Sequence, residues 1–101
     1  MRILVMFDLP METAAERRAY NKFRKGLIRH GFMMLQKSVY VKLALNATVQ
    51  NSVMEAVRRI KPEQGVINMI CLTEKQYQHM ECVLGNNASN QIDSTDRLII
   101  L

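Results

Sequence analysis

The length and composition of this chain favour one small folded domain and argue against a disordered chain. Its 101 residues are 49% hydrophobic and 23% charged, which provides enough apolar surface for one core. The formal net charge of +5 favours a polyanionic partner, and the excess of Lys and Arg is concentrated in residues 1–60.

The first predicted element is a strand over residues 3–7. These five residues are a continuous run of apolar β-formers, which is typical of a central strand covered on both faces. Pro10 cannot donate a hydrogen bond to a neighbouring strand, so the strand ends at about Asp8. Asp8 is the only acidic residue among the first eleven, and it lies at the carboxyl end of this strand.

A helix is predicted from Thr13 to about His30. Thr13 and Glu16 have the spacing of a capping box, and Gly31 provides the C-terminal stop. The spacing of apolar and basic residues predicts two opposite sides, of which the apolar one faces the core. The apolar side consists of Tyr20, Phe23 and Leu27 with Ala19 beside them, and the basic side of Arg18, Lys22, Lys25 and Arg29.

The middle of the chain alternates between β-rich and helical patterns. Residues 32–45 are β-rich, and the pattern leaves open whether they form one long bent strand or a tight hairpin. A helix is predicted over residues 48–60, and residues 66–72 predict an internal strand. The apolar face of that second helix consists of Val49, Val53, Ala56, Val57 and Ile60.

The order of these elements predicts a single α+β domain over residues 1–101, with the ferredoxin-like βαββαβ arrangement and an additional C-terminal strand. Residues 85–96 are polar and predict a loop, and residues 97–101 predict the final strand. Such an apolar strand would leave an exposed sheet edge. Pairing within its own chain is one solution. Exchange with a second copy is the one we expect, which gives a two-fold homodimer.

The cysteines and the N-terminal residues predict a cytoplasmic protein with no membrane partner. The apolar run of residues 3–7 is too short for a secretion signal, and no apolar stretch is long enough to span a membrane. Cys71 and Cys82 have neither metal-ligand nor redox spacing. Cys71 lies in an apolar run, where we expect it to pack as a small hydrophobic residue.

Asp8 is the candidate metal ligand and catalytic residue. Sites are often built at the carboxyl ends of strands, although Asp also ends many strands simply because it favours turns. One carboxylate holds Mg²⁺ or Mn²⁺ weakly, because these ions require octahedral oxygen ligands. A two-fold dimer that brings Asp8 close to its copy would supply two carboxylates.

Seven cations in and after the first helix are the candidate nucleic-acid contacts. No acidic residue interrupts residues 17–30, and Lys and Arg neutralise phosphates. The alternative is a solvated helix face, which is the usual role of a charge run. No base-reading motif is present, so we expect binding that is largely independent of sequence. The seven are Arg17, Arg18, Lys22, Arg24, Lys25, Arg29 and Lys37.

Several segments together resemble the family of CRISPR-associated protein two. Residues 1–10 are similar to its first strand, which ends in an aromatic–Asp pair and an aliphatic residue. Here the pair is Phe7–Asp8, whereas the family usually has Tyr–Asp. The resemblance covers the whole chain in the order of elements, and its motifs lie within residues 1–43. The other similar segments are Arg17–Arg18, Gly31 and Leu35–Tyr40.

The resemblance implies a homodimer that acts in CRISPR adaptation and bridges two copies of an integrase partner around duplex DNA. Members have been described as metal-dependent endonucleases on RNA or double-stranded DNA, with the residue matching Asp8 as metal ligand. Three functions stay open: this DNA-binding scaffold, a Mg²⁺- or Mn²⁺-dependent phosphodiesterase that uses paired Asp8, and a ferredoxin-like domain that binds a small regulatory ligand. The scaffold is favoured, because no His, Glu or Lys accompanies Asp8 as a base.

Overall fold

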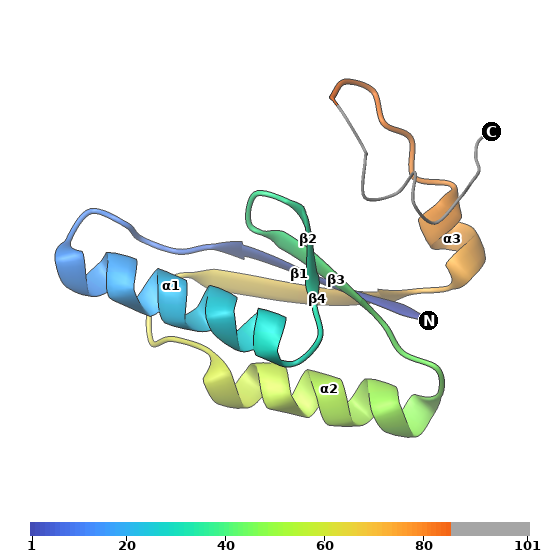
Figure 1. The fold of residues 1–101 in the computed structure, drawn as a ribbon, viewed down its shortest axis with the longest axis horizontal. Coiled ribbons are helices and arrows are strands. Elements are labelled where there is room, and N and C mark those ends of the chain that lie inside the picture. The colour runs from blue at the N-terminus through green and yellow to red at the C-terminus, as the bar shows by residue number, and fades with distance from the viewer. Residues whose placement is uncertain (86–101) are drawn as a thin grey trace.

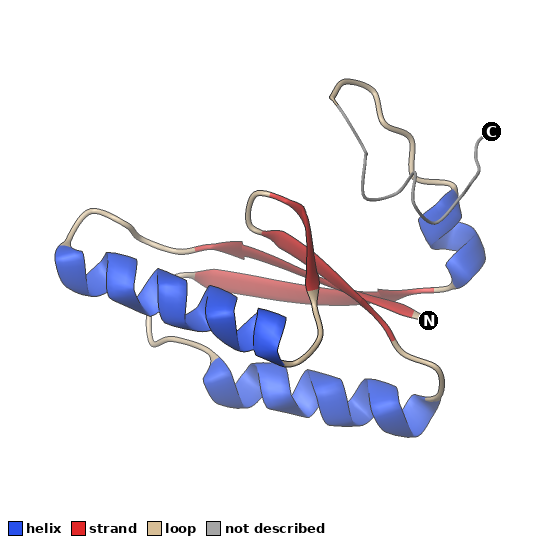
Figure 2. Cartoon of the chain, in the orientation of Figure 1, coloured by secondary structure: helices blue, strands red, loops and turns tan. Residues whose placement is uncertain are grey.

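A four-stranded sheet with two helices on one face forms the frame of residues 1–85, which are the residues described by the computed structural model (Figures 1 and 2). The predicted strand over residues 97–101 and most of the loop before it lie outside this range. No helix within residues 1–85 is long and apolar enough to cross a membrane. The elements are β1 (Arg2–Asp8), α1 (Ala14–Arg29), β2 (Met33–Gln36), β3 (Val39–Leu43), α2 (Ala47–Ile60), β4 (Val66–Leu72) and α3 (Glu74–Gln78).

The strand order β2-β3-β1-β4, with every neighbouring pair antiparallel, confirms the predicted ferredoxin-like arrangement. β1 is central, as predicted. Among the described residues, the prediction that residues 66–72 form an internal strand is wrong, because β4 lies at an edge of the four-stranded sheet. Its apolar run arises because both of its sides are apolar. Ile67, Met69 and Cys71 pack on the core below the helices, while Val66 and Ile70 project from the other side.

The core lies between the sheet and the two long helices. Alternate β1 residues Ile3, Val5 and Phe7 are buried there against Tyr20 and Phe23 of α1. The Phe7 ring lies 5.1 Å from the Phe23 ring in an edge-to-face contact. Burial of one such side chain stabilises the fold by about 1.5–3 kcal/mol. This aromatic contact, together with the buried side chains of Tyr20 and Leu27, packs α1 on the sheet.

Two residues that were predicted on apolar helix faces are exposed. Ala19 lies beside a groove between the helices instead of in the core, and Val49 lies in the first turn of α2. The capping box of α1 is confirmed. The Glu16 amide donates to the Thr13 hydroxyl at 3.1 Å, and the Thr13 amide donates to the Glu16 carboxylate at 2.9 Å. The helix ends at Arg29 with His30 as its C-cap, and the predicted stop residue Gly31 follows with a φ of +93°.

Residues 32–45 contain a hairpin, which settles the choice left open by the sequence. β2 and β3 pair through a turn at Lys37 and Ser38, with an irregular register between Met34 and Gln36. Ser38 adopts a left-handed conformation with φ of +63°, which lets the chain reverse tightly. Its carbonyl accepts a 3.0 Å hydrogen bond from the Phe7 amide. The turn is therefore attached directly to the end of β1.

The short helix α3 was not predicted. It begins with a second capping box, in which the Thr73 hydroxyl accepts from the Gln76 amide at 3.0 Å. Arg2 of β1 holds the helix in place, because its guanidinium donates to the Glu74 carboxylate and lies 4.6 Å from the centre of the Tyr77 ring. Tyr77 packs with two buried side chains, Leu4 and Val41, on the sheet face opposite the long helices.

Within residues 1–85, most of that second sheet face is uncovered, so these residues do not cover β1 on both faces as predicted. We call it the open sheet face. It includes Arg2, Leu4, Met6 and Asp8 of β1 and the residues of β3 and β4 that pair directly with these four. It also includes the residues of β2 that pair with those β3 residues. Apolar side chains that are 37–57% exposed project from it: Met6, Met33, Leu43, Val66 and Ile70.

Candidate metal site and nucleic-acid surface

Asp8 projects from the open sheet face because its neighbours along the chain face the other way. Phe7 is 6% exposed and Leu9 is 7% exposed, and both belong to the core beneath the helices. Side chains alternate along a strand, so the carboxylate between them is directed away from the helices. It is exposed and forms no hydrogen bond or ion pair with any residue in the range 1–85. Its oxygens are therefore available to a ligand.

The backbone around Asp8 is held from both sides. Asp8 pairs with Val66 of β4, and the hydrogen bond from Phe7 to Ser38 secures the other side. Gly65 packs underneath, with φ of +107°. A Cβ atom on it would lie 2.8 Å from the Asp8 carbonyl oxygen and 2.5 Å from Leu9 Cδ2. Sequence reasoning treated Gly65 only as a turn residue, and the structure shows it as a support for the candidate site.

The donor chemistry of Asp8 suits a hard cation, but one chain supplies little of a complete site. Among residues 1–85 no group of three or more His, Cys, Asp or Glu could hold a metal ion. A carboxylate is a good ligand for Mg²⁺ or Mn²⁺, and both ions also accept water and phosphate oxygens. Asp8 therefore fits a metal that is shared with nucleic acid and with a second carboxylate.

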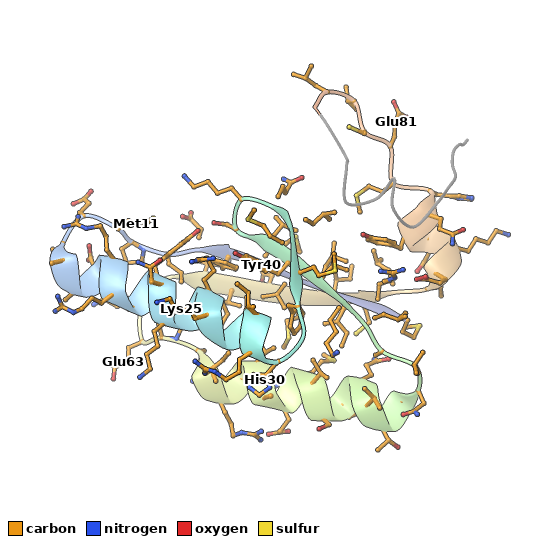
Figure 3. All side chains as sticks on the ribbon, viewed as in Figure 1. Met11, Lys25, His30, Tyr40, Glu63 and Glu81 are labelled. Carbon is orange, nitrogen blue, oxygen red and sulfur yellow. The ribbon has the colours of Figure 1, made fainter. Side chains whose placement is uncertain are left out.

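Four of the predicted nucleic-acid contacts form one line along α1. Spaced four, three and four residues apart, they lie on the side of the helix away from the core and span about 16 Å. All four are exposed, and none forms an ion pair with a residue in the described part of the chain. Lys25 is labelled in Figure 3. We call this line the basic stripe, and its members are Arg18, Lys22, Lys25 and Arg29.

The other three predicted cations lie elsewhere. The Arg17 guanidinium donates to the carbonyl oxygens of Met11 and Glu12 at 3.2 and 3.0 Å, so it braces the loop between β1 and α1. Arg24 is half-buried on the same side of the helix as Arg17, seven residues earlier. Lys37 is exposed in the hairpin turn, next to the end of β1. The predicted set is therefore one continuous stripe and three separate positions.

Comparison with known proteins places both candidate regions within a family match. The family model described as CRISPR associated protein Cas2 matches residues 1–80, which include Asp8 and all of α1. Proteins named CRISPR-associated endoribonuclease Cas2 from Treponema denticola and Ligilactobacillus salivarius are each 43% identical to this chain over 101 residues. The alignments cover the whole of this chain and of each relative. A protein of the same name from Streptococcus mutans is 41% identical to this chain over 101 residues, and the alignment covers 93% of that protein.

A solved structure of low sequence identity to this chain also has this fold. The crystal structure of Streptococcus pyogenes Cas2 aligns with 84% of this chain and 100% of its own, with a TM-score of 0.64 and 23% sequence identity. It has the same fold as this chain. The family match and the relatives that align over the whole chain show which family the chain belongs to. The chain belongs to the CRISPR associated protein Cas2 family.

Proposed function

We propose that this chain acts in CRISPR adaptation as a homodimer that binds duplex DNA, independently of sequence, for an integrase partner. The basic stripe is the observation that carries the proposal. Four exposed cations that form no ion pair within residues 1–85 are available to neutralise phosphates, and their line along a helix suits a regular backbone. Phosphate contacts position DNA without reading its bases.

The open sheet face supports the dimer. A contiguous apolar surface on a small domain is unfavourable in water, and a second copy of the same face would cover it through a two-fold contact. Asp8 lies on this face, in the last β1–β4 pair. A two-fold axis through the face would therefore bring the two Asp8 carboxylates toward the same interface. A metal ion that is shared by the two subunits needs both carboxylates as ligands.

The DNA-binding proposal is tested with the double variant Arg18→Ala, Lys25→Ala. We expect at least a tenfold loss of affinity for duplex DNA, and a slope of log K against log salt concentration that is smaller by about 1.8. Titration of a labelled duplex at several salt concentrations measures both. The double variant Arg58→Ala, Lys75→Ala removes the same charge away from the stripe and should bind like the wild type. Equal slopes in the two double variants would contradict the proposal.

A metal-dependent phosphodiesterase is the second candidate function. It is favoured by the exposed carboxylate of Asp8, which has no partner among the described residues, and by the name endoribonuclease that the relatives carry. In this function both copies of Asp8 would hold Mg²⁺ or Mn²⁺ beside the RNA or DNA backbone. The bound metal supplies stabilisation of charge on the phosphate and a more acidic water molecule. No other group near Asp8 then needs to act as the base.

Asp8→Asn separates the two functions, because it keeps the shape of the side chain and removes its charge. We expect it to abolish metal-dependent cleavage of RNA or duplex DNA, while dimerisation and DNA affinity stay at wild-type values. Cleavage assays with Mg²⁺, Mn²⁺ and EDTA, beside sedimentation and binding measurements, give the comparison. Activity that survives in Asp8→Asn or in EDTA would refute the mechanism. A wild type that cleaves neither substrate leaves only the scaffold function.

A further inference from the structure

The two long helices approach each other closely at Gly26, and a groove lies nearby. Gly26 of α1 approaches Ile60 of α2 so closely that a Cβ atom on it would lie 2.8 Å from Ile60 Cδ1. An open groove with a volume of about 800 Å³ lies between α1 and the connection from α2 to β4. Figure 3 shows Glu63 on this connection, below the first half of α1. The groove is on the helical side of the molecule, opposite the open sheet face from which the Asp8 side chain projects.

Cations line both walls of the groove. Lys22 and Arg29 project from α1, and Arg59 and Lys61 project from the end of α2. All four are exposed and form no ion pair with a residue in the range 1–85. Two acidic residues also line the groove. The carboxylate of one of them, Glu16, already accepts hydrogen bonds from two backbone amides of the helix cap. The charge that faces the groove is therefore mainly positive.

Small apolar residues also line the groove. Ala15 and Ala19 of α1, together with Pro10 and Pro62, leave room without presenting polar side chains. Phe23 also lines the groove but is only 1% exposed, so its ring is not available for stacking on a base. These small apolar residues accommodate sugars, and the cations match phosphates. The groove thus has the chemistry of a backbone-binding site without base recognition.

We propose that this groove holds the sugar–phosphate backbone of one nucleic-acid strand, with Arg59 and Lys61 contacting phosphates from the side opposite α1. The inference rests on the proposed nucleic-acid binding and extends it to a second helix. Lys22 and Arg29 belong to both the basic stripe and the groove, so the two surfaces are continuous. The strand is either one backbone of a duplex or a single-stranded segment, and these share the same phosphate chemistry.

The first test removes the charge of the far wall in the full-length protein. We expect Arg59→Ala, Lys61→Ala to lose at least tenfold in affinity. If the groove holds a duplex backbone, the slope of log K against log salt concentration should become smaller by about 1.8 with duplex DNA. If the groove holds a single-stranded segment, the slope should become smaller by about 1.4 with a single strand of the same sequence. The control is again Arg58→Ala, Lys75→Ala, since Arg58 is adjacent in sequence, pairs with Glu55 and does not line the groove.

The second test fills the groove without changing its charge. Ala19 is exposed and lines the groove, so Ala19→Trp should fold like the wild type but weaken binding at least fivefold. Ala47→Trp, on an exposed alanine at the start of α2 that belongs to neither the groove nor the basic stripe, should bind normally. Thermal unfolding checks that both variants are folded. Each tryptophan adds the same bulk, so a difference between them reports occupation of the groove.

The two proposals can fail separately. If Arg59→Ala, Lys61→Ala and Ala19→Trp bind like their controls while Arg18→Ala, Lys25→Ala loses affinity, the groove inference is wrong and the proposed DNA binding stands. If the wild type binds neither duplex nor single strand, both are wrong. Loss of affinity in both groove variants, with unchanged controls, supports the groove.

Discussion

Asp8 owes its position to small and apolar neighbours instead of to polar partners. Phe7 and Leu9 anchor the strand end in the core, and Gly65 supports the backbone from below. The carboxylate itself has no hydrogen-bond partner among the described residues, so its orientation depends on how rigid this backbone is. Substitutions that move the backbone should therefore affect the candidate metal site without removing any ligand.

Gly65→Ala is the sharpest test of this support. The methyl group would meet the Asp8 carbonyl and Leu9, and the residue would also have to keep φ at +107°. We expect a loss of roughly 1–3 kcal/mol in the free energy of unfolding, from backbone strain alone, with the contact adding to it. Chemical denaturation measures it.

Gly85→Ala provides the matched control for this substitution. Gly85 also has a positive φ, of +117°, but a Cβ atom there would have no neighbour within 4 Å. If the two variants lose the same stability, the contact of Gly65 with the end of β1 contributes nothing. If cleavage is observed in the wild type, Gly65→Ala should lower it more than Gly85→Ala does.

The helices differ in how far their own residues determine them. α1 has sixteen residues, a capping box and a regular apolar side, so its limits could be predicted closely. α3 also begins with a capping box, at Thr73, but five residues are too few to show an amphipathic pattern. Its place depends on contacts with Arg2, which is 72 residues earlier than Glu74 in the chain. Such contacts leave no local pattern.

The strands show the same limit. The β-rich pattern of residues 32–45 fits a long strand and a hairpin equally well, and the choice depends on the left-handed turn at Ser38 and its bond to Phe7. An apolar run such as Val66–Leu72 is typical of an internal strand. In this chain β4 is at an edge, and its exposed apolar side chains belong to the open sheet face instead. The run predicts burial but does not say what covers it.

Residues 1–85 form a sheet with one covered and one largely uncovered face, and a dimer is the simplest way to cover the second. We expect Ile70→Glu to convert the dimer to a monomer, because a carboxylate buried in an apolar interface costs at least about 2 kcal/mol per subunit. Ile70 is 46% exposed in the single chain, so the substitution should leave the fold intact. Sedimentation at several protein concentrations measures the change.

Ile28→Glu is the control for this substitution. Ile28 is 48% exposed, which is close to the value for Ile70, but it lies on α1 away from the open sheet face. We expect this variant to remain a dimer. If Ile70→Glu sediments as the same dimer, the open sheet face is not the dimer interface. Exchange of the segment 97–101 then remains as the other predicted source of dimerisation, and it lies outside the described residues.

The sequence by itself determined the order of the main elements, the ends of the long helices and the basic side of α1, and its motifs pointed to the family. These features follow from patterns within a few turns of one element. Only the tertiary structure decided the edge position of β4, the support of Asp8 by Gly65, and the groove that places Lys22 opposite Arg59. The physical reason is that periodicity records which side of an element is apolar, whereas packing decides which element that side meets.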